Sequence, residues 1–447
     1  MPNLQIEYTP IYALRAQRQN ARTHSKRQIR QIADSIERFG FCNPILVDDD
    51  LTILAGHGRV AAAQLLNLTT VPTVRLSHLS EADKRAYVIA DNRLAEKAGW
   101  DRDLLALELQ SLIDIGFEVE LTGFEMPEID LLLDEALEAA GLTSAADDDV
   151  PDKPNGPPTS RSGDLWISGK HRLLCGDARD QACYAELLGG RPVDFVFTDP
   201  PYNVPINGHV SGNGRVRHRE FAMASGEMSE PEFTQFLSTT LSLAVNASRD
   251  GALHYVCMDW RHLFELLSAG RALYDGLLNL CVWNKDNGGM GSFYRSKHEL
   301  VAVFKVGSVP HINNVELGRH GRNRTNVWDY AGVNTFKAGR LDELAIHPTV
   351  KPVALVADIL RDASRRCDLV LDPFAGSGTT LIAAEKTGRE ACALEIDPTY
   401  ADVIVQRWQS YTGRPALLAA TGATFEELTE QRKPKAPSPV LADPGAR

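Results

Sequence analysis

The first 80 residues alternate between helical hydrophobic spacing and short apolar runs. A helix is predicted at residues 26–39, with apolar side chains three and four positions apart, at Ile29, Ile32, Ile36 and Phe39. Gly40 is its expected C-cap. Apolar runs at 44–47 and 51–54 predict two strands, and a glycine turn then opens an alanine-rich helix at 60–66. This order predicts a small α+β domain.

The C-terminal part has longer apolar runs, each ending in polar or conformationally special residues. Residues 193–197 and 369–371 are predicted to be buried strands, and 391–394 a third. A helix is expected at 381–386, directly after a glycine-rich turn. Two further core strands are expected within 281–285 and 298–304. Strands joined by helices indicate an α/β domain.

Two segments are too polar or too rich in proline to be expected to fold. Asp147-Asp148-Asp149 and the prolines after it predict a flexible linker. The C-terminal tail, rich in Pro and Ala, is predicted to be disordered. Residues between the first domain and the linker predict acidic amphipathic helices and show no evident helix-turn-helix. The predicted parts are a first domain, 1–78; a helical extension, 79–142; a linker, 143–162; a large domain, 163–430; and a tail, 431–447.

Composition narrows the protein class. The 447 residues contain 47 Lys+Arg and 59 Asp+Glu, a net charge of −12, but residues 11–38 are locally basic, which suits an anionic partner. No apolar run is long enough for a transmembrane helix, and the first residues do not resemble a signal peptide. Seven scattered cysteines without a C-x-x-C pair predict reduced thiols in the cytoplasm and no metal site.

The first chemical motif is Asp199-Pro200-Pro201-Tyr202, directly after the predicted strand at 193–197. Because proline cannot continue a strand ladder, the motif is displayed at the strand's C-terminal edge, where α/β sheets bind ligands. Asp199 and the Pro200 carbonyl can each accept a hydrogen from an exocyclic amino group. Tyr202 can stack on the base. The motif therefore predicts a holder for a planar amino group that faces a methyl donor.

The second motif is a strand, glycine turn and helix that runs from Asp372 through Phe374, Gly376, Ser377 and Gly378 to Thr379. The Lys of a nucleotide P-loop is absent. A dinucleotide fingerprint is only half present, because no third glycine follows at its place. Glu395 ends the next strand about twenty residues later, where an acidic side chain can bind ribose hydroxyls. A ligand with ribose but no pyrophosphate fits S-adenosylmethionine.

Together the two motifs resemble the amino-directed DNA methyltransferases, over about residues 163–412. The catalytic motif precedes the cofactor motif, as in the β group of that family. Further matches are Leu174-Cys175-Gly176-Asp177 and His347-Pro348-Thr349-Val350-Lys351-Pro352. The resemblance implies a doubly wound, mostly parallel, Rossmann-like α/β sheet. It also implies that Asp177 contacts the cofactor adenine, that Glu395 holds the ribose, and that the glycine loop holds the methionine part.

The N-terminal part resembles ParB/Spo0J-type domains over about residues 8–78. The resemblance lies in Asn20-Ala21-Arg22-Thr23-His24-Ser25, Pro44-Ile45-Leu46-Val47 and Gly56-His57-Gly58-Arg59. Members of that family bind DNA-associated partners, and some bind and hydrolyse CTP with G-E-R-R at the glycine turn. Only Gly56 and Arg59 match that turn here, so a CTP-like nucleotide stays an open alternative to a plain docking domain.

Two basic stretches are expected to contact double-stranded DNA. One follows the catalytic motif, and the other is the recognition region expected at about 305–346. Their arginines suit phosphate and base-edge contacts. Lys285 could also reach phosphate, or could snorkel. The predicted DNA contacts are Arg215, Arg217, Arg219, Arg319, Arg322 and Arg324.

The sequence thus predicts a cytoplasmic DNA methyltransferase that transfers methyl directly to the N6 amino group of a flipped adenine. The Asp-Pro-Pro-Tyr spelling more often marks adenine in this family. Transfer to cytosine N4 is one alternative, and a ParB-like regulatory protein with a vestigial methyltransferase part is another. By family habit, a homodimer and a stand-alone enzyme of a phage, a mobile element or a restriction-modification system are also expected.

Overall fold

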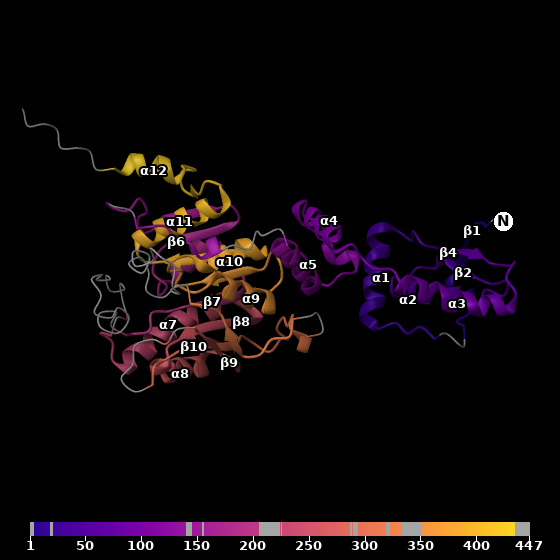
Figure 1. Ribbon diagram of the computed structural model, residues 1–447, viewed down its shortest axis with the longest axis horizontal. Helices are drawn as coiled ribbons and strands as arrows, with labels where there is room; N and C mark the ends of the chain where they lie inside the picture. The colour runs from indigo at the N-terminus through magenta and orange to yellow at the C-terminus, as the bar shows by residue number, and fades with distance from the viewer. Residues whose placement is uncertain are drawn as a thin grey trace, which may run out of the picture. The chain divides into compact units, whose positions relative to one another are not determined.

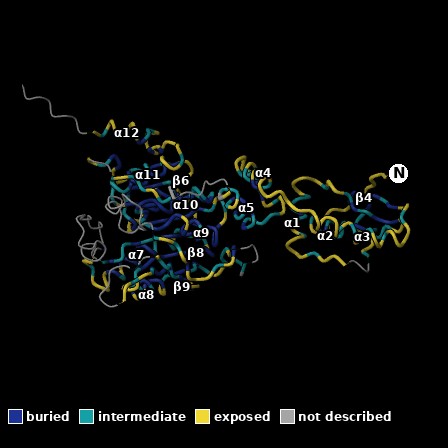
Figure 2. Tube along the Cα trace, in the orientation of Figure 1, coloured by how far each residue is buried: buried dark blue, intermediate teal, exposed yellow. Residues whose placement is uncertain are grey.

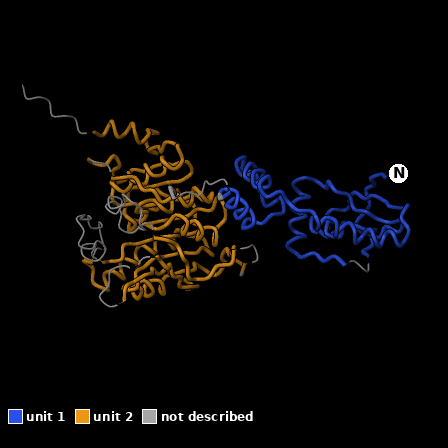
Figure 3. The backbone as a smooth tube through the Cα atoms, viewed as in Figure 1, with its two compact units in different colours: residues 1–140 blue, residues 141–447 orange. Residues whose placement is uncertain are grey.

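A computed structural model of the chain divides into two compact units, residues 1–140 and 141–447 (Figure 3). Each unit is described by itself. The structure describes residues 4–17, 21–139, 145–153, 156–204, 224, 226–286, 288, 294–318, 322–332 and 350–433.

Unit 1 contains a four-stranded mixed sheet in the order β1-β4-β2-β3 (Figure 1). Strand β2 pairs parallel with β4, whereas β1–β4 and β2–β3 are antiparallel. A small apolar core that includes Ile45, Val47 and Val71 lies under this sheet. The strands are β1 (Ile6–Pro10), β2 (Ile45–Val47), β3 (Ile53–Ala55) and β4 (Thr70–Arg75).

The helices of unit 1 begin where the sequence places polar caps. Ser25 accepts from the Gln28 N–H to start α1, and Gly40, at φ +82°, ends it as predicted. The two helices expected before the linker are α4 and α5, which pack around Leu109 and Ile129. The helices are α1 (Lys26–Phe39), α2 (His57–Leu65), α3 (Glu81–Glu96), α4 (Arg102–Asp114) and α5 (Met126–Ala139), with 3₁₀ turns η1 (Ile11–Ala13) and η2 (Val119–Thr122).

Unit 2 is built on a ten-stranded sheet in the order β11-β9-β10-β8-β7-β12-β13-β6-β5-β14. The central strands β8, β7, β12, β13 and β6 are parallel to their neighbours in this series. Antiparallel strands flank them on both sides, at β10 and at β5. The strands are β5 (Leu165–Ser168), β6 (His171–Cys175), β7 (Val193–Thr198), β8 (Ser248–Met258), β9 (Gly276–Asn284), β10 (His298–Lys305), β11 (Val327–Asp329), β12 (Leu369–Asp372), β13 (Glu390–Glu395) and β14 (Leu417–Leu418).

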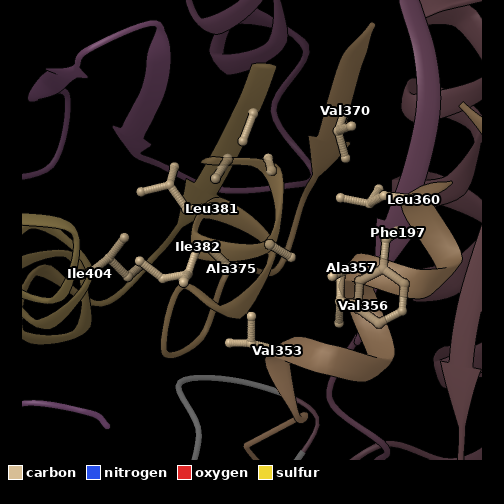
Figure 4. Close-up of a cluster of buried hydrophobic side chains, with 14 of the residues drawn as sticks. Phe197, Val353, Val356, Ala357, Leu360, Val370, Ala375, Leu381, Ile382 and Ile404 are labelled. Carbon is tan, nitrogen blue, oxygen red and sulfur yellow. The ribbon is translucent and has the colours of Figure 1, made fainter. Parts of the chain in front are cut away.

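Helices cover both faces of this sheet, so the predicted doubly wound, mostly parallel α/β fold is confirmed. Buried stretches follow the central strands (Figure 2). Phe197 of β7 faces the core formed with α9, α10 and α11 (Figure 4), whereas Val196 faces the opposite core. The helices are α6 (Gln181–Leu188), α7 (Glu230–Ala247), α8 (Leu263–Leu273), α9 (Val353–Ala363), α10 (Thr379–Thr387), α11 (Pro398–Thr412) and α12 (Phe425–Arg432), with 3₁₀ turns η3 (Ala145–Asp148), η4 (Trp260–His262) and η5 (Glu316–Gly318).

Part of the segment expected to be a flexible linker, 143–162, is packed against the rest of unit 2. Thr159 and Ser160 are buried, and their N–H groups donate to the Asp402 carboxylate at 2.7 and 2.8 Å. These two residues are therefore held by hydrogen bonds, whereas the composition of the segment had predicted flexibility. Among the described helices, none is long and apolar enough to cross a membrane. The predicted disordered tail lies outside the described residues from 434 onward.

Candidate active site

The two sequence motifs meet at one edge of the sheet because their strands are neighbours. Strand β7 pairs parallel with β12, with Phe195 opposite Val370. The carboxyl ends of parallel strands lie at the same edge, so Asp199 follows β7 beside the glycine turn that follows β12. Strands β13 and β6 continue the series and end at Glu395 and Cys175, two residues before Asp177. The chain thus places the predicted catalytic and cofactor residues along one edge.

A cluster of four charged groups surrounds the catalytic motif. The Lys351 ammonium donates to Asp199 Oδ2 and lies 3.0 Å from Glu299 Oε2. The Lys285 ammonium donates to Glu299 Oε1. The Tyr202 hydroxyl donates to Asp199 Oδ1 at 2.5 Å. Two carboxylates and two ammonium groups therefore balance each other beside the motif.

The register of β9 and β10 explains why Lys285 and Glu299 are partners. Strand β10 runs antiparallel to β9 with Glu299 opposite Trp283, so Lys285, which follows β9, lies at the same edge. Its ammonium also lies 4.5 Å from the centroid of the Trp283 ring. Lys285, for which phosphate contact and snorkelling were the alternatives, forms a partly buried ion pair with Glu299. Contact with phosphate stays a prediction.

The charges of this cluster shift the protonation of its members. Burial raises the pKa of Asp199, and the charge of Glu299 adds to this rise while Lys351 opposes it. Burial would also raise the pKa of Glu299, but Lys351 and Lys285 outweigh burial and lower it to about 2. Burial opposes the charge of Lys351, yet the two carboxylates raise its pKa well above the ordinary value. Lys351 is therefore a permanent cation at neutral pH.

The glycine turn after β12 is held by backbone geometry and by Asp372. Gly376 and Gly378 have positive φ values of 56° and 82°, and a Cβ on Gly378 would approach Ile404 to 2.9 Å. Asp372 Oδ1 accepts from the Phe374 N–H at 3.1 Å, and Oδ2 accepts from the Thr380 hydroxyl at 2.5 Å. Burial raises the pKa of Asp372 to about 7.

Glu395 links the next strand to the same turn. Its Oε2 accepts from the Gly376 N–H and its Oε1 from the Asp397 N–H, both at 2.9 Å. Burial raises the pKa of this carboxyl to about 7 as well. Each oxygen keeps a second lone pair, so Glu395 can still accept hydroxyl groups, as predicted for a ribose holder.

The side chains of the remaining cofactor candidates contact different partners within the protein. Asp177 forms a two-pronged ion pair with Arg179, which outweighs burial and lowers its pKa. Phe374 packs 5.9 Å from Phe236, ring centroid to centroid. The buried Ser377 and Thr379 hydroxyls lie 3.3 Å from the Arg407 guanidinium. Ligand contact by these side chains stays a prediction.

Two of the six arginines predicted to contact DNA form ion pairs within unit 2. Arg322 is buried and donates to Asp362 Oδ1 at 2.8 Å. Arg324 pairs with Asp362 and with Asp358, at 2.7 and 3.0 Å. These guanidinium groups bind carboxylates of α9, so contact with phosphate at either position would have to compete with these ion pairs. The other four lie outside the described residues: Arg215, Arg217, Arg219 and Arg319.

The glycine turn of unit 1 is also described. Gly56, at φ +106°, begins α2, as expected for a strand, glycine turn and helix. The Arg59 guanidinium turns back to the Pro44 carbonyl at 3.3 Å, and burial lowers its pKa. Nucleotide binding at this turn stays a prediction.

Sequence reasoning did not assign a role to Glu299 or Lys351, although it quoted Lys351 within a motif. Glu299 stands near the start of an apolar strand, in His298-Glu299-Leu300-Val301, and a charged residue at such a position is the signal that could have identified it. A buried charge at such a position needs a partner.

Three family models match successive parts of the chain. The ParB N-terminal domain matches residues 2–93, the ParB-methyltransferase HTH domain matches 103–162, and the DNA methylase model matches 193–406. The second match corrects the absence of a helix-turn-helix in our prediction. The pattern was hidden because residues 103–152 contain no Lys or Arg, the usual mark of a DNA-binding helix.

Two curated relatives match different parts of the chain. The ParB-like nuclease domain-containing protein YnaK of Escherichia coli is 45% identical over 82 residues, which is 18% of this chain and 94% of the relative. The Type II methyltransferase M2.MboI of Moraxella bovis is 23% identical over 230 residues, 49% of this chain and 82% of the relative. One relative is thus ParB-like and the other is a methyltransferase, the two families that the sequence resembles.

Solved structures that match parts of the chain include two methyltransferases and a partition protein. A putative DNA modification methylase from Thermus thermophilus, complexed with S-adenosyl-L-methionine, is 22% identical with a TM-score of 0.38, over 57% of this chain and 96% of that chain. The cytosine-N4-specific PvuII DNA methyltransferase has 16% identity and a TM-score of 0.41, over 63% and 94%. ParB from Caulobacter crescentus, complexed with CTP-gamma-S, has 23% identity and a TM-score of 0.25, over 31% and 88%. Taken with the motif geometry, the three model matches show that the chain carries a DNA methylase domain, a ParB N-terminal domain and a ParB-methyltransferase HTH domain.

Proposed function

We propose that this protein transfers a methyl group from S-adenosylmethionine to the N6 amino group of adenine in DNA. The observation that carries the proposal is the position of Asp199, beside the glycine turn and at the same edge as Glu395. A base amino group held by Asp199 would therefore lie next to a bound cofactor. The spelling Asp199-Pro200-Pro201-Tyr202 supports adenine, by resemblance to family members.

Asp199 keeps the capacity to accept a base amino group even though both of its oxygens have partners. Tyr202 uses one lone pair of Oδ1, and Lys351 uses one of Oδ2. A carboxylate offers about four lone-pair positions, so acceptor capacity is left for the substrate. The Pro200 carbonyl supplies the second acceptor, with no N–H of its own. Two acceptors orient both amino hydrogens and leave the nitrogen lone pair for attack on the methyl carbon.

Lys351 ensures that Asp199 is an acceptor. Burial and Glu299 favour the protonated form of Asp199, which would offer a donor where the amino group needs an acceptor. The ammonium of Lys351, which donates to Asp199 Oδ2, opposes this and favours the ionised carboxylate. After methyl transfer, the Asp199 carboxylate would accept the proton that the amino nitrogen loses.

The residues at the glycine turn fit a cofactor that carries a positive charge and a ribose. Asp372 and Glu395 are buried carboxyls that accept hydrogen bonds from N–H and O–H groups. Glu395 would accept the ribose hydroxyls, and the turn at Gly376 and Gly378 would admit the methionine part. S-adenosylmethionine supplies an electrophilic methyl group on a sulfonium centre.

The test is methyl transfer by the full-length chain. Purified protein is incubated with tritiated S-adenosylmethionine and unmethylated genomic DNA, and the DNA is hydrolysed to identify the labelled base. Label in N6-methyladenine is the expected result. Label in N4-methylcytosine would reject the adenine assignment and keep the rest. Cofactor binding without labelled DNA would reject the reaction and favour a regulatory role.

A further inference from the structure

The 3₁₀ turn η3, near the start of unit 2, contacts the helices that support the active site. This segment consists of residues 145–148, and it follows unit 1 in the sequence. Asp147 Oδ2 accepts from the Lys386 ammonium at 2.5 Å, and Asp148 Oδ1 accepts from the Val353 N–H at 2.8 Å. These contacts join the segment to α10, which follows the glycine turn, and to α9, which follows Lys351.

Asp148 supplies the cap that helix α9 lacks. The N-cap residue of α9 is Pro352, whose side chain cannot accept a hydrogen bond. The first N–H of the helix, on Val353, is satisfied instead by a carboxylate 205 residues earlier in the chain. Because Val353 is two residues after Lys351, this bond fixes the point from which the Lys351 side chain reaches Asp199.

Arg407 joins the same segment to the glycine turn. Its Nη2 donates to the Asp147 carbonyl at 2.9 Å, and its Nη1 donates to the Ser377 carbonyl at 3.0 Å. The Thr379 hydroxyl, 3.3 Å from the same Nη1, donates in turn to the Lys351 carbonyl at 3.2 Å. A continuous set of bonds thus connects η3 with both motifs.

The acidic character of η3 suits this arrangement. Arg407 is buried, and burial lowers its pKa to about 10, while Asp148, Asp147 and Asp149 oppose the shift. Without nearby carboxylates, a buried guanidinium between two backbone carbonyls would be costly. The acidic residues therefore stabilise the cation that holds the glycine turn.

We propose that residues 145–148 form a clasp that positions both halves of the active site, with Asp148 acting through Lys351 and Arg407 acting through the glycine turn. The inference rests on the proposed function, since it assigns positioning residues for that reaction. It makes residues 145–148, near the start of unit 2, part of the scaffold of the methyltransferase site. Asp148 and Arg407 are positioning residues that touch neither the reacting base nor the methyl group.

The experiment separates the two halves of the clasp by their kinetic effects in the full-length chain. Asp148→Ala is expected to lower kcat for DNA methylation roughly tenfold while the Kd for S-adenosylmethionine stays near wild type, because small displacements of catalytic groups are costly. Asp148→Asn, which can still accept from the Val353 N–H, is expected to restore most of kcat. Arg407→Lys is expected to raise the Kd for the cofactor about tenfold, with a smaller change in kcat.

Asp152→Ala is the matched control, because Asp152 is an exposed acidic residue that follows the clasp in the sequence. It should leave kcat and Kd unchanged. Equal values for Asp148→Ala and Asp152→Ala would overturn the clasp while the proposed function stands. Parallel losses of kcat, cofactor affinity and melting temperature in Asp148→Ala and Arg407→Lys would show a purely structural role and also overturn it. A wild-type chain that neither binds the cofactor nor methylates DNA would reject the proposed function, and the clasp with it.

Discussion

Two pairs of buried carboxyls lie along one edge of the sheet, and the protein compensates them in opposite ways. Asp199 and Glu299 are paired with two ammonium groups, Lys351 and Lys285. Asp372 and Glu395 instead have partners that are N–H and O–H groups, and both have pKa values raised to about 7. The catalytic side thus carries its own cations, whereas the cofactor side favours a cation from outside. The edge is therefore divided by charge into a side for a neutral base and a side for a cationic cofactor.

Removal of the catalytic carboxylate is expected to have the largest effect. Asp199→Ala removes an acceptor that orients the amino group, so methyl transfer should fall by at least about 10³-fold, the upper range for loss of one preorganised electrostatic group. S-adenosylmethionine binding should stay within about twofold, because none of the hydrogen bonds described for Asp372 and Glu395 involves Asp199. Initial rates and calorimetric Kd values check both statements. Activity equal to wild type would reject the mechanism.

Loss of the cation between the two catalytic carboxylates should have the next largest effect. Lys351→Met leaves Asp199 and Glu299 facing each other, so the pKa of Asp199 should rise and activity at pH 7 should fall about 10²-fold, the cost of a wrongly protonated or misplaced catalytic group. Part of the activity should return at higher pH, where Asp199 ionises again. The measurement is the pH profile of kcat.

A second substitution tests whether charge is the cause. Adding Glu299→Gln to Lys351→Met removes the repelling carboxylate and should shift the pH profile back toward neutrality. A double variant whose pH profile matches that of Lys351→Met would show that packing, not charge, is responsible.

How far the sequence predicts this edge depends on the kind of interaction. The catalytic and cofactor motifs were predictable because an apolar run must form a strand and Pro200 or Gly376 must end it. The ion pair between Lys285 and Glu299 was not, because it depends on the antiparallel register of β9 and β10. The bond between Asp148 and Val353 spans 205 residues, and composition alone makes its acidic segment resemble a linker.

The number of charged residues along the chain also did not reveal that Arg322 and Arg324 pair with carboxylates. A basic, polar stretch predicts a nucleic-acid surface equally well whether its arginines face solvent or pair with carboxylates. Asp358 and Asp362 lie on α9, more than thirty positions further along the chain, so their role as partners could not be seen locally.

The same conservative change on the two sides should affect stability differently. Glu299→Gln leaves two ammonium groups with one carboxylate and should destabilise the fold by about 3 kcal/mol, as when one partner of a buried pair is removed. Asp372→Asn can still accept from the Phe374 N–H and can donate to Thr380, so its free energy of unfolding should change by less than about 1 kcal/mol.

Denaturant unfolding at pH 7.5 measures both variants. Because Glu299 has a lowered pKa of about 2, its stabilising effect is present above its ordinary pKa and is lost as the pH falls toward 2. The wild type and Glu299→Gln should therefore converge in stability at low pH. Equal destabilisation of the two variants at pH 7.5 would remove the distinction between the two sides.

The smallest expected effect is a pH dependence of cofactor affinity. Asp372 and Glu395 have pKa values of about 7, so as the pH falls from 7.5 to 6 they take up protons and lose the charge that favours a sulfonium. If one of them must be ionised, the Kd for S-adenosylmethionine should rise about eightfold over this range. The demethylated product, S-adenosylhomocysteine, has a neutral sulfur, so its Kd should rise less. Calorimetry with both ligands at the two pH values is the measurement. An equal rise for both ligands would mean that ionisation serves the ribose alone. A Kd independent of pH would mean that cofactor binding does not depend on the ionisation of either carboxyl, which would contradict the proposed division of the edge by charge.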